Sequence, residues 1–343
     1  MIEGPLRSLL AQDYPGRAGV IVIDDRSSDG TAATAKAVAV AQAVAAAQAV
    51  LPAVPGLPLQ VVDGADPPPG WAGKPWALHQ GVVAAKAGTF IPEYLLLSDA
   101  DIVHPPDSLR RLVAAAIAGD RDLVSLMARL RTATGWERLL VPAFVYFFTQ
   151  LYPFRRVADP SAPTAAAAGG CVLVRTAALD AAGGVATIAG ERIDDVALAR
   201  AVQDAGGSLW LGLADDVASV RPYPALRDLW AMVARSAATQ LGHSRVALAA
   251  TLAGLAALYL GPVALVVGGV ASGGAGAAPA GAAAWAAMIT TYVPMVRYYR
   301  LPLPWAATLP FTAVLDGART AGSVRHHRGG GPAWKGRRPP ATA

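Results

Sequence analysis

Three groups of aspartates occupy positions where acidic side chains could do chemistry. They are Asp24, Asp25 and Asp29, then Asp99 and Asp101, then Asp194 and Asp195. Each group alone also fits ordinary turn or helix-start chemistry, because aspartates accept hydrogen bonds from nearby backbone N–H groups. Carboxylates gathered at one place, however, repel one another unless a cation or hydrogen-bond donors lie among them. Together the three groups predict a binding site that includes a cation.

The Asp99-x-Asp101 spacing suits a divalent cation bound to a diphosphate. Mg²⁺ or Mn²⁺ prefers one or two carboxylates together with phosphate oxygens and water. Zinc is disfavoured, since the histidines have no zinc-type spacing and Cys171 is the only cysteine. The pair Asp194 and Asp195 is then free to act as a base.

The elements that must position these aspartates alternate along the chain. Predicted strands cover residues 20–24, 57–64, 93–101, 122–130 and 169–176, and predicted helices cover residues 32–50, 75–88, 105–119 and 194–206. This alternation predicts an α/β fold with a doubly wound, mostly parallel sheet. Ligands bind at the carboxyl ends of the strands in such sheets. The first two acidic groups fall there, and the third falls at the start of a helix.

The composition fits a soluble head joined to a membrane part. Of the 343 residues, 54% are hydrophobic and only 15% are charged, and the mean hydropathy is +0.39. Residues 1–245 form the predicted head. Residues 246–271 and 276–296 carry no charge, and the first stretch exceeds the roughly 20 residues needed to cross a bilayer. We therefore predict a C-terminal transmembrane helical hairpin.

Basic residues flank the predicted hairpin at both ends. Those nearest to it are Arg235, Arg245, Arg297 and Arg300. The positive-inside rule then places both ends of the hairpin at the cytoplasmic face. Residues 301–315 are too short and proline-rich to span, so within a membrane region of 246–318 they would be re-entrant or interfacial. A basic cytoplasmic tail follows at 319–343. The formal charge of +5 thus gathers beside apolar segments, which favours a membrane surface over nucleic acid.

A further uncharged stretch of aliphatic and aromatic residues covers residues 139–154. It is short for a transmembrane helix. A helix lying in the headgroup layer and a buried core helix both fit the pattern, and we favour the interfacial helix.

Five segments carry a resemblance to a known family. They are VIVIDDRSSDGT, GWAGKPWALHQG, LLLSDADIVHPP, AGGCVLVRTAAL and IDDVALARAV. In this order they resemble the motifs of a family-2 inverting glycosyltransferase of GT-A fold. The surrounding sequence, such as SLLAQDYPG and PAWKGR, is most similar to the hopanoid-associated membrane glycosyltransferases, and also to ceramide glucosyltransferases. The resemblance covers nearly the whole chain. It implies sugar transfer from a nucleotide-sugar to a hopanoid, polyterpenoid or ceramide-like lipid at a bacterial-type inner (plasma) membrane.

The resemblance also implies a role for each matching aspartate. Asp25, with Asp24 beside it, would contact the nucleotide and read its base. Asp99 would face the ribose and the phosphate, next to the Mg²⁺ or Mn²⁺ that Asp101 holds on the diphosphate. Asp195 would be the general base, and Asp194 stands where the family has glutamate.

Three other residues are candidates for substrate contacts. Lys74, in a glycine-bounded loop, would add a positive charge near the donor, the alternative being a solvent-facing lysine. Trp71, like Trp76, fits packing better than a sugar platform, although it stays a candidate for acceptor binding. Arg235 is a second acceptor candidate. It lies where the family has a Q/R-x-x-R-W motif, but no tryptophan follows it here.

The chain departs from the family at its start. Family chains begin with a membrane helix and a first strand, whereas Met1 lies inside the helix that follows them. The missing strand would lie between the strands at 20–24 and 93–101, and without it two rows of backbone groups lose their partners. Because the later motifs are coherent, we favour a start codon set too far downstream over a remnant.

Two functions follow from these observations. The leading one is a metal-dependent inverting glycosyltransferase, and the alternative is a non-catalytic, truncated, membrane-anchored remnant that binds nucleotide without turnover. A nucleotidyltransferase fits less well, because it gives Asp195 no role.

Overall fold

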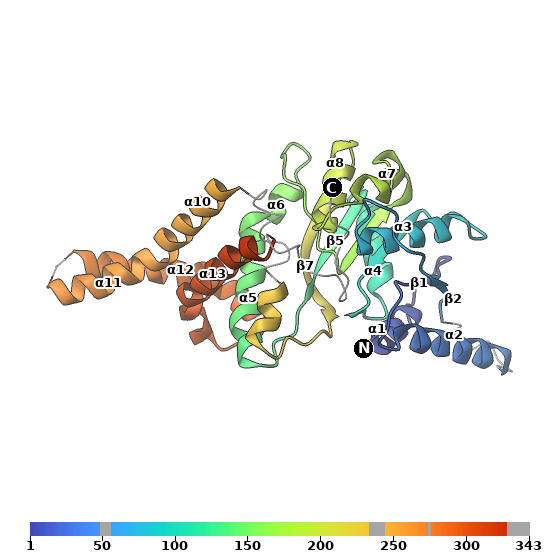
Figure 1. The fold of residues 1–343 in the computed structure, drawn as a ribbon, viewed down its shortest axis with the longest axis horizontal. Coiled ribbons are helices and arrows are strands. Elements are labelled where there is room, and N and C mark those ends of the chain that lie inside the picture. Colours follow the sequence, from blue (N-terminus) through green and yellow to red (C-terminus); the bar gives the residue numbers. More distant parts are fainter. Residues whose placement is uncertain (49–55, 233–243, 274–275, 328–343) are drawn as a thin grey trace. The chain divides into compact units, whose positions relative to one another are not determined.

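The structure, a computed structural model, describes residues 1–48, 56–232, 244–273 and 276–327 (Figure 1). It contains two compact units. The first consists of Met1–Leu130 and Tyr152–Arg221, and the second consists of Arg131–Leu151 and Pro222–Ala343. Residues 131–151, which belong to the expected head, thus fall in the second unit. The expected boundary near residue 245 stays a prediction.

The first unit contains the predicted alternation of strands and helices. Its strands are β1 (Val20–Asp24), β2 (Leu59–Asp63), β3 (Tyr94–Ser98), β4 (Ile102–Val103), β5 (Leu123–Arg129), β6 (Cys171–Arg175) and β7 (Leu209–Ser219). Its helices are α1 (Glu3–Leu10), α2 (Thr31–Gln48), α3 (Gly73–Lys86), α4 (Ser108–Ala118), α6 (Phe154–Val157), α7 (Thr176–Ala181), η1 (Val185–Ile188) and α8 (Asp194–Asp204). Every predicted strand and helix of this unit is present, whereas β4 and β7 were not predicted.

The strands form two sheets of different character. β1 and β2 make a two-stranded parallel sheet, and the other strands make a five-stranded sheet in the order β3-β6-β5-β7-β4. In the larger sheet only β5 and β7 pair in parallel, whereas β6 is antiparallel to both of its neighbours and β4 is antiparallel to β7. The prediction of a mostly parallel sheet is therefore wrong for the larger sheet, which is mixed.

The reversed strand β6 explains this difference. A strand–helix–strand crossover favours a parallel pair, but β6 follows β5 only after the chain has passed through residues 131–151 of the second unit. The preference for a parallel pair therefore does not apply to β5 and β6. As a result the start of β6, not its end, lies beside the carboxyl end of β3, with Cys171 opposite Ser98.

The small β1–β2 sheet is held mainly by packing. Two strands alone are marginally stable, but a cluster of buried residues from α1 and α2 covers one face, where Val20 and Val22 point. On the other face, Gly81 of α3 lies against Ile23. Among the described residues, β1 and β3 each have a strand partner on one side only. A strand between them stays a prediction.

The larger sheet carries the main core of the first unit. Helix α4 packs Leu112, Val113 and Ala116 onto one face, against a group of buried residues from β5, β6 and β7. Cys171 belongs to this core, and burial raises the pKa of its thiol to about 12. The sequence-based interpretation of Cys171 as a small buried hydrophobe is confirmed.

The second unit is helical. Its described elements include α5 (Gly135–Leu151), α10 (Arg245–Leu255), η2 (Ala256–Leu260), α11 (Gly261–Ser272), α12 (Ala277–Tyr298), η3 (Leu303–Thr308) and α13 (Leu309–His327). In α5, the side chains of Leu140, Val141 and Val145 are fully buried, as in a core helix. Contact of residues 139–154 with a membrane stays a prediction.

One described helical stretch, Val246–Ser272, is long and apolar enough to cross a membrane. Helix α12 packs closely against α11 at Gly269 and Gly281, where an added Cβ would meet the neighbouring helix. Small residues at such contacts let helices approach. The second span at 276–296 is thus a helix, but its crossing of the membrane stays a prediction.

The end of the predicted membrane region differs from expectation. The proline-rich residues 301–315 form η3 and the first turns of α13. Arg319, expected at the start of an exposed basic tail, is fully buried in α13 beside Asp316, with Nη1 and Oδ1 3.0 Å apart. Helix α13 continues to His327, so residues 319–327 are helical. A basic cytoplasmic tail at 319–343 stays a prediction. Residues 328–343 lie outside the described part.

Candidate active site

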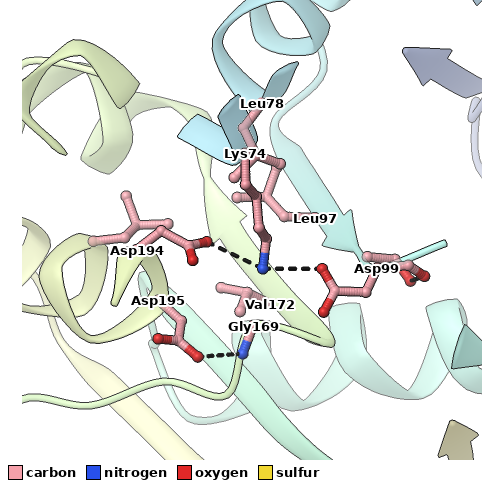
Figure 2. A pocket seen from close by; sticks show the side chains of 10 residues that line it. Lys74, Leu78, Leu97, Asp99, Gly169, Val172, Asp194 and Asp195 are labelled. Atoms are coloured by element: carbon pink, nitrogen blue, oxygen red, sulfur yellow. Dashed lines mark hydrogen bonds and ion pairs between the residues drawn. The ribbon is translucent and has the colours of Figure 1, made fainter. Parts of the chain in front are cut away.

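A small pocket at the edge of the larger sheet gathers residues from four elements (Figure 2). They come from the first two turns of α3 and α8, from the end of β3, and from the start of β6 with the turn before it. The lining consists of Lys74, Leu78, Leu97, Ser98, Asp99, Gly169, Val172, Asp194, Asp195 and Leu198. The predicted candidates Lys74, Asp99, Asp194 and Asp195 thus lie together, whereas Asp24, Asp25, Asp101 and Trp71 do not line the pocket.

Lys74 lies at the centre of the polar groups. Its Nζ is 2.9 Å from Asp99 Oδ1 and 3.1 Å from Asp194 Oδ2. Burial would lower the pKa of Lys74, but the negative charges of Asp99, Asp194 and Asp195 outweigh burial and raise it. The ammonium therefore stays charged and points into the pocket, as Figure 2 shows, rather than into solvent.

Asp195 is the acid whose pKa is best placed for proton transfer. Its Oδ2 accepts from Gly169 N at 2.7 Å, and its Oδ1 accepts from its neighbour Val196 N at 2.9 Å. Burial and the charge of Asp194 raise the pKa of Asp195 to about 6, against the opposing effects of Lys74 and the two N–H groups. A carboxylate with this pKa is ionised at neutral pH and still basic enough to take a proton.

Gly169 lets two charged side chains approach the backbone closely. A Cβ at this position would lie 2.8 Å from Lys74 Nζ and 3.1 Å from Asp195 Oδ2. Gly169 was not among the predicted site residues. The signal was present in the Gly169–Gly170 pair just before an apolar strand, since adjacent glycines in such a place indicate a close approach of backbone to other groups.

The two acids of the Asp99-x-Asp101 motif point to different partners. Both follow the end of β3 in a tight turn, in which Ile102 N donates to Asp99 O. Asp99 binds Lys74, whereas Asp101 Oδ2 accepts from Ser219 Oγ at 2.7 Å. No group of three or more metal-binding side chains occurs in the part of the chain that the structure describes.

The carboxylates of Asp99 and Asp101 nevertheless suit a cation whose other bonds go mainly to phosphate oxygens of a substrate. Mg²⁺ and Mn²⁺ favour hard oxygen donors and need only one or two carboxylates when phosphate oxygens complete the shell. Asp99 and Asp101 offer such oxygens from one turn. Metal binding at these residues stays a prediction.

Buried His104 supports the end of β3. Its Nε2 is 2.9 Å from Ser98 Oγ and its Nδ1 is 3.1 Å from Ser108 Oγ. Burial lowers the pKa of His104 to about 4. The imidazole is therefore neutral, and its two nitrogens can donate to one hydroxyl and accept from the other.

The first acidic group is built into a turn. Asp24 Oδ1 accepts from the backbone N–H of Ser27 at 3.2 Å and from its hydroxyl at 2.5 Å. Asp29 Oδ1 accepts from Thr31 N at the start of α2. Asp25 is buried, with 9% of its surface exposed. A nucleotide-binding role for Asp24 and Asp25 stays a prediction.

The two acceptor candidates differ in what the structure describes. Trp71 packs against Trp76 and His79, with ring centroids 5.1 and 4.9 Å away. Trp76 Nε1 donates to Ala65 O, which fixes the loop before α3. Packing of Trp71 agrees with the favoured interpretation. Arg235 lies outside the described residues.

Comparisons with known proteins place the chain among sugar-transferring enzymes. The sequence profile of glycosyl transferase family 21 matches residues 37–318. Among solved structures, S. aureus TarS is similar at 15% identity and a TM-score of 0.39, over 91% of this chain and 52% of that chain. TarS 1–349 in complex with UDP shows 16% identity and a TM-score of 0.38, over 97% and 88%. TarS 1–349 in complex with UDP-GlcNAc shows 16% and 0.35, over 96% and 88%.

This chain spans about half the length of the first of these TarS chains, 52%. No curated protein sequence matches it. The broad content of the resemblance, a glycosyltransferase, is confirmed, whereas its family-2, GT-A and hopanoid-associated details stay predictions. Since the matched residues make up well over half of the chain, the protein belongs to glycosyl transferase family 21.

Proposed function

We propose that the protein is a membrane-bound glycosyltransferase that moves a sugar from a nucleotide-sugar to a hydroxyl of a lipid, with inversion at the anomeric carbon. The observation that carries this proposal is the pocket in which Asp195, with its raised pKa, lies near the partly buried positive charge of Lys74. These are the two groups that such a transfer needs, a base for the acceptor and a cation for the leaving group.

Asp195 would act as the general base. A lipid hydroxyl is a poor nucleophile at neutral pH, so a carboxylate within hydrogen-bond reach takes its proton as the oxygen attacks the anomeric carbon. The C–O bond to the new sugar forms while the bond to the nucleoside diphosphate breaks. One such displacement inverts the configuration at that carbon.

Lys74 would bind the leaving diphosphate. Its ammonium now neutralises Asp99 and Asp194. As the glycosidic bond breaks, negative charge builds on the diphosphate, and a fixed cation in a partly buried pocket stabilises that charge. The ion pairs to the two acids orient the lysine before substrate arrives.

Asp99 and Asp101 would hold a divalent cation on the diphosphate. When bound, Mg²⁺ or Mn²⁺ acts as a Lewis acid that lowers the cost of the leaving negative charge. The two carboxylates come from one turn at the end of β3, so they would bind it next to the Lys74 side of the pocket.

A lipid acceptor agrees with the apolar surface of the second unit. Along Val246–Ser272, several large side chains are mostly exposed, among them Val246 (80%), Val267 (62%) and Val270 (72%). Such a surface is costly in water and favourable in a bilayer. A hopanoid, polyterpenoid or ceramide-like lipid at the cytoplasmic face of an inner membrane fits this proposal.

The test is a donor and acceptor screen with the full chain in detergent. UDP- and GDP-sugars, including UDP-glucose and UDP-GlcNAc, are offered with a bacterial lipid extract, and products are identified by mass spectrometry. We expect a lipid that gains one hexose mass, and NMR of the product should show an anomeric configuration opposite to that of the donor.

Two results would contradict parts of the proposal. Nucleotide binding without any product would favour the non-catalytic alternative. A product with the donor's anomeric configuration would rule out single displacement, because retention requires a second displacement step. Asp195→Asn run in parallel shows whether the product depends on the pocket.

A further inference from the structure

Ser125 is a fully buried hydroxyl in an otherwise apolar part of β5. Its neighbours Val124 and Leu126 contribute to the core of the first unit. A buried hydroxyl costs free energy unless it is hydrogen-bonded, and alanine or valine would fill this place without that cost. The bonds that Ser125 makes therefore show what the hydroxyl contributes.

All of these bonds go to the turn that precedes β6, which we call the 168–171 turn. Ser125 Oγ accepts from Ala168 N at 2.8 Å. It lies 3.1 Å from Cys171 O and 3.3 Å from Ala168 O, and it can donate to either. The ladder between β5 and β6 ends at the pair Ser125 and Val172. The hydroxyl thus adds hydrogen bonds between β5 and the 168–171 turn, just beyond the last backbone pair of β5 and β6.

The 168–171 turn touches the candidate active site at two points. Gly169 N donates to Asp195 Oδ2 at 2.7 Å, and Gly170 O accepts from Asp99 N at 3.3 Å. One turn therefore joins the acid at the start of α8 to the acid at the end of β3. Ser125 itself does not line the pocket, so its effect on the site passes through this turn.

We propose that Ser125 is a positioning residue for sugar transfer, which fixes the 168–171 turn so that the Gly169 N–H holds the Asp195 carboxylate toward the pocket. The catalytic part of this inference rests on the proposed function, whereas the fixing of the turn does not. Serine is suited to the task because one small group both accepts from Ala168 and donates to Cys171.

The first measurement is hydrogen–deuterium exchange of the full chain in detergent, read on peptides that cover residues 165–173. In Ser125→Ala we expect the amides of this segment to exchange about tenfold faster, since a lost buried hydrogen bond shifts local opening by that order. Ser125→Thr keeps the hydroxyl and should exchange as the wild type does. Thr176→Val is the matched control.

Thr176 suits this purpose because it also carries a buried hydroxyl, bonded to Pro92 O, but lies at the opposite end of β6. Its replacement removes a hydrogen bond that lies just beyond the paired residues of β3 and β6, without touching the 168–171 turn. Thermal unfolding of all variants shows whether Ser125→Ala has lost more than this local structure.

The second measurement is turnover with the nucleotide-sugar that the wild type uses in the screen of UDP- and GDP-sugars. In Ser125→Ala we expect kcat to fall about 10- to 100-fold with the donor KM within about twofold, because a small misplacement of a base has that effect. The acid limb of the pH profile should also move to higher pH, since the lost N–H no longer stabilises the charged carboxylate. Ser125→Thr should recover most of kcat.

The outcomes separate the two proposals. Unchanged exchange in Ser125→Ala would overturn the inference, and so would faster exchange with unchanged kcat and pH profile in an active enzyme. Faster exchange in a chain whose wild type turns over no donor would support the fixing of the turn and count against the proposed function.

Discussion

The tripeptide Ile-Asp-Asp occurs twice in the chain, at residues 23–25 and 193–195, with different outcomes. In the first copy, Asp24 accepts hydrogen bonds from Ser27 and closes a turn after β1. In the second copy, the two acids start α8 and meet Lys74 and the N–H of Gly169. The local sequence is the same, so the difference comes from what distant segments place opposite each pair.

The comparison shows how burial and neighbouring charges change the pKa of an acid. Asp195 has a raised pKa because burial and the adjacent charge of Asp194 disfavour its ionised form. The carboxylate of Asp24, by contrast, accepts hydrogen bonds from the neighbouring Ser27. A lysine and a glycine from distant segments, rather than the acidic pair itself, distinguish the second copy.

The sharpest test of this difference is Asp195→Asn. We expect transfer to fall by about 10²- to 10⁴-fold, the usual contribution of a general base. The matched change in the other copy, Asp25→Asn, should weaken donor binding more than it lowers kcat, if Asp25 reads the base. Radiolabel incorporation into lipid checks both, with membrane insertion unchanged. Retained turnover in Asp195→Asn would refute its role as base.

Asp101→Ala tests the proposed metal site. We expect a loss of at least about 100-fold, since the carboxylate would no longer hold the cation on the diphosphate. Chelation of divalent cations should inactivate the wild type, with recovery on adding Mn²⁺. Ser219→Ala keeps the carboxylate and removes only its hydrogen bond, so it should cost far less. Activity that survives chelation would contradict a role for Asp101 in metal binding.

Lys74→Met should lower kcat about 100-fold, because the leaving diphosphate loses a fixed positive charge. It should also change the pH profile. The wild type should lose activity as the pH falls through about 6, where Asp195 becomes protonated. The Lys74 charge lowers the pKa of Asp195, so its removal should move this limb to higher pH. An unmoved limb would show that the limb does not report Asp195.

Gly169→Ala should reduce transfer by about tenfold or more, since the added methyl group would press on both Lys74 and Asp195. Gly4→Ala is the control, because a Cβ there meets nothing within 4 Å. Steady-state kinetics with circular dichroism separates loss of activity from loss of fold. Equal activity in the two variants would mean that the contact at Gly169 is unimportant.

The smallest effect should come from Asp24→Ala in the first copy. Loss of the bonds to Ser27 should cost about 1 kcal/mol of stability, with kcat within a few-fold of the wild type. Thermal unfolding and turnover together check this. A loss of turnover as large as that of Asp195→Asn would erase the difference between the two copies.

Local patterns were sufficient for most elements of the first unit. Apolar runs bounded by acids or glycines predicted β1, β3 and β6, and the high alanine content of residues 32–50 predicted α2. Strand β7 was missed because Gly212 and the pair Asp215 and Asp216 interrupt its pattern. The reversed direction of β6 was beyond such reasoning, since it depends on a long excursion of the chain rather than on any local signal.

The site was predictable in part for the same reason. Residue type and spacing pointed to Asp99, Asp194 and Asp195, and Lys74 was a candidate with two interpretations. Sequence alone did not reveal that Asp101 would bind Ser219, nor that Gly169 would touch two charged groups. These contacts join residues more than 20 positions apart, and only the fold decides them.

The place of β6 also bears on how the chain is made. This strand lies between β3 and β5, yet it is synthesised after both. Until residue 175 has left the ribosome, its two neighbours must wait with open edges, which invite wrong partners. The centre of the larger sheet therefore forms late. Synthesis of α5 between β5 and β6 prolongs the time during which the open strand edges need protection, for example by a chaperone.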